Sequence, residues 1–178
     1  MSAILEEPAG NVRVLTINRP ETLNALTPET SSELGERLER AGADRAVRAV
    51  VLTGAGAAFS AGGDVTFLQE LARMPAGEAG ELVYRAFQRP IRAIRAMEKP
   101  VIAAVNGAAV GAGCEIALAA DFRIASAAAR FGEVWIRLGC VPALGGMFLL
   151  PRIVGLGRAT EMILTGEIID AAEARRIG

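Results

Sequence analysis

The sequence predicts a single α/β domain in which strands and helices alternate and the strands run largely parallel. Three observations support this. Short apolar runs typical of strands are followed by segments whose apolar residues recur at helical spacing. The composition is 52% hydrophobic with 20 glycines and only 4% aromatic residues, so we expect a core of aliphatic side chains around close backbone contacts. The length of 178 residues suits one domain with a substantial core.

The first half of the chain predicts two strands and two helices. Residues 12–17 alternate as a strand, and Asn18-Arg19-Pro20 turns the chain. Thr27 is expected to cap a helix that starts at Pro28 and buries Leu34, Leu38 and Ala41. Residues 49–53 (AVVLT) predict a strand buried on both sides, and a loop then leads to a helix from residue 65.

The second half continues the alternation. Apolar residues at helical spacing predict a helix over residues 78–97, which Lys99-Pro100 stops. We then expect a strand at 101–105, an apolar helix at 114–120, a strand at 122–125, a loop with Trp135 and Pro142, and helices at 144–154 and 170–176. The runs VVLTG and VIAAVNG, each a strand ending in a glycine turn, form a weak internal repeat typical of successive turns of a spiral.

Composition also limits the chemistry. The chain has no histidine, which excludes Ser-His-Asp and Cys-His catalysis within it and removes the commonest zinc ligand, so we predict no metal site. A net charge of −1 provides no general attraction for nucleic acid or an anionic membrane. Cys114 and Cys140 are expected to be small buried hydrophobic residues. The first residues do not resemble a signal peptide, and we expect a cytoplasmic protein.

Two glycine-rich turns are the most informative feature of the sequence. Residues 60–64 (SAGGD) and 111–115 (GAGCE) each follow a predicted strand region and precede a predicted helix. The first N–H groups of a helix lack intrahelical partners and attract negative charge, so two such turns facing one another would hold one oxyanion from two sides. The second turn adds Glu115 in an apolar stretch, where partial desolvation is expected to raise the carboxyl pKa toward values useful for proton transfer.

These turns, together with Asn24-Ala25-Leu26 and Gly139-Cys-Val-Pro-Ala-Leu-Gly-Gly146, make the sequence resemble the enoyl-CoA hydratase/isomerase (crotonase) family over nearly its whole length. The resemblance implies a ββα spiral and a coenzyme A thioester as substrate, with no separate cofactor. It places an oxyanion hole at the N–H groups of Gly63 and Ala112 and a catalytic glutamate at Glu115. Substrate contacts are implied at Ala25, Leu26, Ala61, Asp64, Val65 and Thr66. Asp64 is also expected to cap the following helix.

The second glutamate that hydratases of this family use is missing from its usual position. Alignment of Phe131-Gly132 and Leu138-Gly139 with the family pattern places Trp135 there, and the aspartate that some other members use is Ala143. Glu133 lies two residues from Trp135 and is a minor candidate. Trp135 is either core packing or a flat wall for a bulky acyl group. The sequence therefore leaves hydration, double-bond isomerisation and a non-catalytic acyl-CoA-binding role open.

The end of the chain also differs from the family pattern. Residues 170–178 resemble the helix that ordinarily precedes a further strand and a C-terminal helical region. The resemblance therefore predicts one crotonase-like domain over residues 1–178 that is truncated at its C-terminal helices. It also implies assembly into trimers or pairs of trimers.

Overall fold

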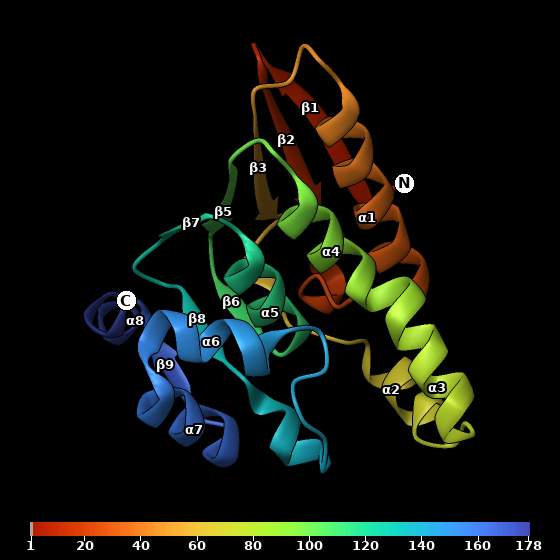
Figure 1. The fold of residues 1–178 in the computed structure, drawn as a ribbon, viewed down its shortest axis with the longest axis vertical. Coiled ribbons are helices and arrows are strands. Elements are labelled where there is room, and N and C mark those ends of the chain that lie inside the picture. The colour runs from red at the N-terminus through yellow and green to blue at the C-terminus, as the bar shows by residue number, and fades with distance from the viewer. Residues whose placement is uncertain (1) are drawn as a thin grey trace.

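Two sheets form the centre of the molecule in the computed structural model, which describes residues 2–178 (Figure 1). The five-stranded sheet has the order β1-β2-β3-β5-β7, and the four-stranded sheet has the order β4-β6-β8-β9. The strands are β1 (Ile4–Ala9), β2 (Val12–Ile17), β3 (Ala49–Gly54), β4 (Ala58–Ser60), β5 (Val101–Val105), β6 (Ala108–Val110), β7 (Phe122–Ala125), β8 (Arg130–Gly132) and β9 (Ile168–Asp170).

Consecutive strand pairs alternate between the two sheets. β3, β5 and β7 are parallel neighbours in the larger sheet, and β4, β6 and β8 are parallel neighbours in the smaller one. Each pair therefore adds one strand to each sheet, and a helix follows it, which produces the ββα spiral that the sequence predicts. Only β1 with β2 and β8 with β9 pair antiparallel among the named strands.

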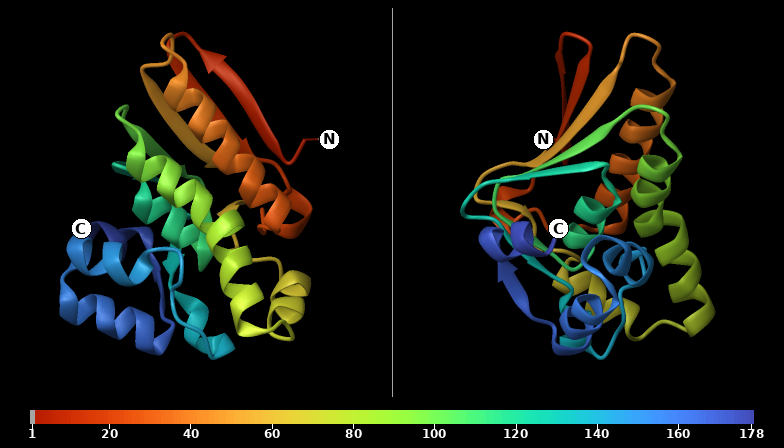
Figure 2. Two further views of the ribbon diagram at one scale, coloured as in Figure 1. Left: turned by 45° about the vertical axis from the view of Figure 1, so that its right-hand side comes forward. Right: turned by 60° about the vertical axis from the view of Figure 1, so that its left-hand side comes forward.

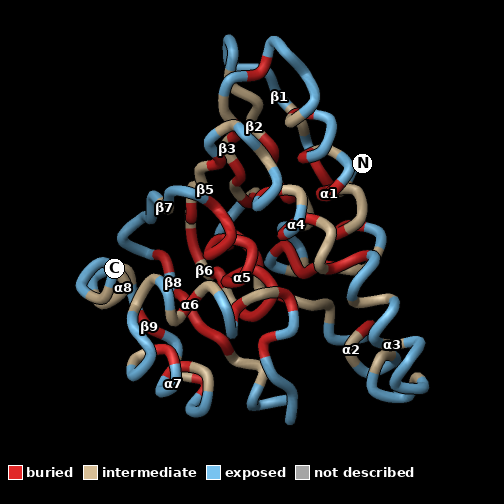
Figure 3. The backbone as a smooth tube through the Cα atoms, in the orientation of Figure 1, coloured by how far each residue is buried: buried red, intermediate tan, exposed pale blue. Residues whose placement is uncertain are grey.

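The helices that pack on the two sheets differ in how far they are buried. α1 (Pro28–Ala43) and α4 (Gln88–Ala96) lie side by side over the larger sheet (Figure 2). α5 (Ala112–Ala119) lies in the interior, and all eight of its residues are buried (Figure 3). α2 (Val65–Leu71) and α3 (Ala76–Leu82) form a largely exposed arm, whereas α6 (Gly146–Val154), α7 (Leu156–Thr165) and α8 (Ala171–Ile177) pack around β9.

Most of the long predicted elements are present, and the differences have local causes. Thr27 caps α1 by accepting a hydrogen bond from the Thr30 N–H at 3.3 Å. The predicted helix over 78–97 starts at Ala76 and changes to a π-helical segment at Val83–Phe87. The strand at 49–54 is buried on alternate residues rather than on both sides. β4, β6, β8 and β9, three residues each, were not predicted because three residues carry no usable periodicity.

Three further elements also escaped the sequence pattern. β1 contains two glutamates and a proline, so its composition argues against a strand, and its pairing with β2 decides its structure. A short 3₁₀ helix at Val134–Leu138 replaces the predicted loop around Trp135. The ten-residue helix α7 was also not predicted.

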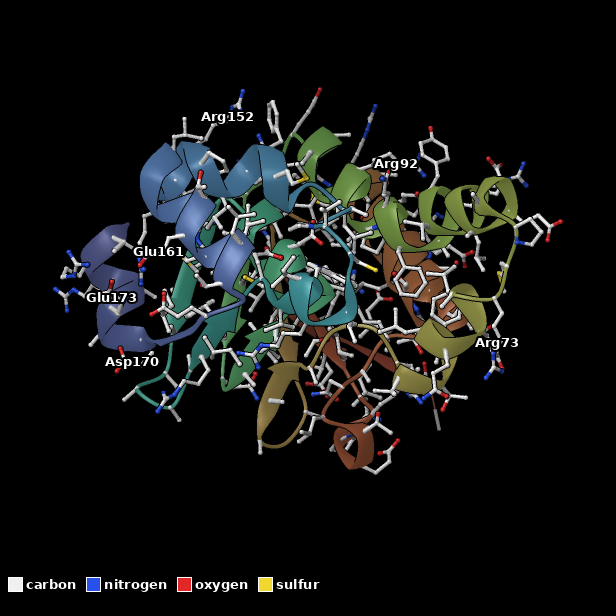
Figure 4. All side chains as sticks on the ribbon, turned by 90° about the horizontal axis from the view of Figure 1, so that it is seen from below. Arg73, Arg92, Arg152, Glu161, Asp170 and Glu173 are labelled. Atoms are coloured by element: carbon white, nitrogen blue, oxygen red, sulfur yellow. The ribbon has the colours of Figure 1, made fainter. Side chains whose placement is uncertain are left out.

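Charged side chains lie mainly at the periphery of the fold. The residues labelled in Figure 4 extend outward from the ribbon, and they include Glu161 and Glu173. Arg158 joins these two glutamates and Glu167, at N–O distances of 2.5, 3.2 and 2.9 Å, and so ties α7 to α8. Among residues 2–178, no helix is long and apolar enough to cross a membrane.

Candidate active site

The first glycine-rich turn follows β4 and is fixed largely by buried side chains. Asn24 adopts a left-handed conformation and donates from Nδ2 to the carbonyl oxygens of Ala55 and Ala58, at 2.9 and 2.7 Å. Ser60 donates to the Asn24 carbonyl at 2.8 Å and accepts from the Gly62 N–H at 3.2 Å. Backbone hydrogen bonds from the Ala61 N–H to the Leu23 carbonyl and from the Leu26 N–H to the Gly62 carbonyl, at 2.9 and 2.7 Å, also hold the turn.

The same turn leads into α2 through a side-chain cap. Asp64 accepts hydrogen bonds from the N–H groups of Thr66 and Phe67 at 3.1 and 3.4 Å, which confirms the predicted cap. The Arg19 guanidinium lies 3.7 Å from the other Asp64 oxygen and donates to the Ala25 carbonyl at 2.6 Å. The segment around Ala25 and the start of α2 are therefore held to each other.

The second glycine-rich turn follows β6 and is fixed by backbone packing. Gly111 has a φ of +53° and donates to the Gly132 carbonyl at 2.8 Å. Gly113 packs so closely on the first turn that a Cβ at this position would overlap the Ser60 carbonyl oxygen. Glycine is required here because any side chain would push the two turns apart. The sequence thus brings the two turns together by leaving side chains out.

Two N–H groups remain available where the turns meet. Leu26 forms a parallel bridge through the Gly62 carbonyl and the Asp64 N–H, so the N–H of Gly63 faces away from Leu26. Ala112 is the first residue of α5, and its N–H has no intrahelical acceptor. A Cβ on Gly62 would lie only 3.4 Å from the Ala112 nitrogen, which shows how near the two turns are. The arrangement can hold a partial negative charge on a ligand oxygen.

Glu115 lies one turn of α5 beyond Ala112 and is completely buried. Its Oε2 atom accepts hydrogen bonds from the N–H groups of Leu144 and Gly146 at 2.9 and 2.5 Å, at the start of α6. Burial raises the pKa of Glu115 to about 7, while these two N–H groups lower it. A carboxyl group with a pKa near neutrality can both accept and return a proton, as the sequence analysis anticipated.

A second buried carboxyl group, Glu133, lies beside Glu115. Both carboxyl groups lie next to Gly146: a Cβ added to this glycine would be 2.8 Å from Glu133 Oε1 and 3.0 Å from Glu115 Oε2. Burial, and after it the charge of Glu115, raise the pKa of Glu133 to about 9. The indole N–H of Trp135 lowers the pKa of both carboxyl groups. The Trp135 ring also packs against the second turn, 3.6 Å from where a Cβ on Gly111 would lie.

An apolar cavity of about 490 Å³ opens next to the first turn. Gly63, Val65 and Trp135 line it, together with apolar side chains of α2, the π-helical segment and the loop before α6. Its walls include Phe67, Leu68, Leu71, Phe87 and Leu144. Glu115 and Glu133 are not among its lining residues, and the Trp135 indole borders both the cavity and the carboxyl groups.

Comparison with known proteins agrees with this geometry. The family model described as enoyl-CoA hydratase/isomerase matches residues 7–178. The chain belongs to this family. Over 176 residues it is 46% identical to a crotonyl-CoA hydratase of Syntrophomonas wolfei, with 98% of this chain and 66% of the relative covered. It is 39% identical over 178 residues to a 1,2-epoxyphenylacetyl-CoA isomerase of Escherichia coli, with 100% and 68% covered.

A solved structure of the family shares the fold closely. A putative enoyl-CoA hydratase/isomerase of Legionella pneumophila superposes with a TM-score of 0.95 at 34% identity, over 99% of this chain and 68% of the other. The chain thus spans about two thirds of the length of the relatives it matches. The chain therefore shares its overall fold with this solved structure.

The residues predicted for substrate binding lie in three environments. Val65 and Thr66 are exposed at the start of α2, and Val65 borders the cavity together with Trp135. Ala61 and Asp64 are partly buried in the first turn. Ala25 and Leu26 are buried, and Leu26 has no exposed surface at all. Leu26 is joined to the site by its backbone bridge to Gly63, and its contact with substrate stays a prediction.

One of the two expectations for the cysteines needs correction. Cys114 is buried, as predicted, and burial raises its thiol pKa. Cys140 is exposed and lines the cavity, because it follows the 3₁₀ helix on the open side of the site. Glu133 was treated as a minor candidate. Its position after β8, the third parallel strand of the smaller sheet, places it at the edge where the glycine turns after β4 and β6 meet.

Proposed function

We propose that this chain is an acyl-CoA-processing enzyme that stabilises a thioester enolate. The N–H groups of Gly63 and Ala112 bind the thioester oxygen, and Glu115 transfers a proton at the neighbouring carbon atoms. One observation carries the proposal. The N–H groups of Gly63 and Ala112 lie close together without hydrogen-bond acceptors, and one helical turn beyond Ala112 is Glu115, whose carboxyl pKa is about 7. The names of its relatives, a crotonyl-CoA hydratase and an acyl-CoA isomerase, support the same substrate class.

The proposed chemistry follows from where charge develops. When a proton leaves the carbon next to the thioester, or water adds to an enoyl double bond, negative charge moves to the carbonyl oxygen. Two fixed N–H donors stabilise that charge without reorganisation, and one such donor is worth about 3–4 kcal/mol in comparable sites. The thioester itself supplies the activation, so no separate cofactor is required. The cavity beside Gly63 is proposed to hold the acyl chain, with Trp135 as a flat wall.

One carboxylate suffices to move a proton between two carbon atoms, whereas water addition benefits from two groups around one water molecule. We therefore propose double-bond isomerisation or hydration of an enoyl-CoA. The missing glutamate at Trp135 favours isomerisation, and the hydratase among the relatives favours hydration.

Glu115→Gln tests the proposal. Glutamine keeps the size and the acceptor oxygen but cannot take the proton, so turnover should fall by a factor of about 10² to 10⁴. Loss of crotonyl-CoA absorbance, formation of 2-enoyl-CoA from 3-enoyl-CoA, and calorimetric binding of butyryl-CoA should be measured together. Glu98→Gln, at an exposed position, is the matched control and should behave like the unaltered chain. Unchanged turnover in Glu115→Gln would remove the assigned role.

A non-catalytic acyl-CoA-binding protein is the second candidate. It is favoured by one observation: Glu115 has no exposed surface and does not line the cavity. If a CoA thioester binds but neither enoyl substrate turns over, and no proton of butyryl-CoA exchanges in D₂O, this second function holds instead of the first.

A further inference from the structure

Four buried polar atoms lack hydrogen-bond partners and belong to three neighbouring side chains. They are Glu115 Oε1, both carboxyl oxygens of Glu133 and the indole Nε1 of Trp135, and none has a partner among the described residues. Buried polar atoms are almost always paired, with protein or with an ordered water molecule. Four that converge indicate a polar space that a small hydrogen-bonding molecule fills.

Two glycines shape this space. Gly146 lets the two carboxyl groups pack close to the start of α6, because a Cβ there would lie 2.8 Å from Glu133 Oε1, 3.0 Å from Glu115 Oε2 and 2.9 Å from the Pro142 side chain. Gly111 lets the Trp135 ring pack on the second turn, where the indole N–H is near enough to lower the pKa of both carboxyl groups. The donors and acceptors therefore come from three different parts of the chain: α5, the residues after β8, and the start of α6.

The fixed donors around the two carboxyl groups are unequally divided. Leu144 and Gly146 both donate to Glu115 Oε2, whereas Glu133 has no backbone donor among the described residues. The other titratable group that acts on Glu133 is the Cys114 thiol, which is buried and uncharged at neutral pH. Negative charge is thus supported on Glu115 and unsupported on Glu133.

We propose that Glu133 holds a proton beside ionised Glu115, and that the two carboxyl groups and the Trp135 indole enclose one bound water molecule. The inference rests on the proposed function. Glu133 is then a positioning residue in the proposed reaction. It keeps the Glu115–Glu133 pair at a single negative charge and orients Glu115 through the water molecule. The indole N–H contributes the donor. Glu133 and Trp135 together then occupy the region that the missing second glutamate would serve.

The charge of the pair determines the expected pH dependence. Glu115 must lose its proton to act as a base, so activity rises through its pKa of about 7. Ionisation of Glu133 near pH 9 places a second negative charge beside the developing enolate, so activity falls above that pH. The rate should fall about tenfold for each pH unit above the pKa of Glu133.

Glu133→Gln is the decisive variant because glutamine copies the protonated carboxyl group. Exchange of the proton next to the thioester of butyryl-CoA in D₂O, followed by mass spectrometry, should still rise near pH 7, and the shape of the pH profile, not the height of its plateau, is the readout. The decline near pH 9 should disappear. Trp135→Phe keeps a ring but removes the N–H donor, so the rise should move to higher pH. The exposed Glu98→Gln variant controls for general effects of pH and should retain both the rise near pH 7 and the decline near pH 9.

An infrared measurement tests the same proton without substrate. At pH 8, where Glu115 is mostly ionised and Glu133 still holds its proton, the unaltered chain should show the carbonyl band of a buried, protonated carboxyl group, and Glu133→Gln should largely lack it. The inference is overturned if that band is absent from the unaltered chain or if the alkaline decline persists in Glu133→Gln. Failure of the proposed function is distinguishable, because it would appear as undiminished exchange in Glu115→Gln.

Discussion

The two glycine-rich turns differ in how they are held and in what lies beside them. The first turn is fixed by the side chains of Asn24, Ser60 and Asp64 and leads into the exposed arm of α2. The second is fixed by glycine packing and leads into α5, which has no exposed residue. The first borders the apolar cavity, and the second carries Glu115.

The difference shows that one binding site can combine a turn that tolerates movement with a turn that does not. Side-chain hydrogen bonds on the first turn can be lost singly, each at a modest cost. Gly113 in the second turn has no such reserve, because an added Cβ would lie 2.3 Å from the Ser60 carbonyl oxygen. We therefore expect changes at the second turn to have the larger consequences.

Gly113→Ala should have the largest effect. The added Cβ would overlap the Ser60 carbonyl oxygen, so the turns must separate and the two N–H donors lose their common target. Turnover should fall by a factor of about 10² or more, as for loss of one oxyanion donor. Overpacking should also lower stability by about 1–3 kcal/mol, measured by urea unfolding.

The matched control is Gly80→Ala on the exposed arm, where a Cβ meets no atom within 4 Å. That variant should retain full turnover and gain slightly in helix stability. Equal behaviour of Gly113→Ala and Gly80→Ala would show that the close approach of the turns is unimportant.

The second-largest expected effect is a pH dependence of stability, which arises from Glu115 at the second turn. The pKa of Glu115 is about 7 in the folded chain and near 4.5 when unfolded, so the folded state retains a proton that the unfolded state has lost between these values. Glu115 should therefore lower the free energy of unfolding by up to about 1.4 kcal/mol per pH unit as pH rises from about 4.5 to 7. Glu133, whose folded pKa is about 9, adds a fall of the same sign that continues to about pH 9.

Glu115→Gln should remove this part of the pH dependence. Thermal unfolding of the unaltered chain and the variant at several pH values supplies the measurement, with the difference in midpoint expected to widen toward pH 7. A constant difference across that range would argue against a buried Glu115 that ionises near neutrality.

Ser60→Ala should have the smallest effect of the three and should act on the first turn. It leaves the Gly62 N–H and the Asn24 carbonyl without their side-chain partner, which should cost about 1–3 kcal/mol of stability. We expect weaker butyryl-CoA binding by calorimetry and a rate loss well below that of Gly113→Ala.

Ser31→Ala is the control for Ser60→Ala. Ser31 is equally buried, but its hydroxyl has no hydrogen-bond partner among the described residues. Its removal should leave stability unchanged or slightly higher. If both serine variants lose stability equally, the hydrogen bonds of Ser60 do not hold the first turn.

Local patterns in the sequence were sufficient for the spiral and for the order of its larger elements. Residues 12–17, 101–105 and 122–125 are strands as predicted, and the caps at Thr27 and Asp64 are present. Each of these depends on neighbours in the sequence. The three-residue strands β4, β6 and β8 depend on partners about fifty or twenty residues away, so no local pattern marks them.

The sequence by itself determined the family, the two glycine-rich turns and the position of Glu115, because glycine spacing and helix starts are local properties of the chain. A trimeric assembly, which the resemblance implies, and a cytoplasmic location, which the cysteines and the first residues indicate, stay predictions. Only the tertiary structure decided that Glu133 and Trp135 lie beside Glu115. These residues meet because β4, β6 and β8 end at one sheet edge, and burial there, not residue type, sets the proton affinity of the two carboxyl groups.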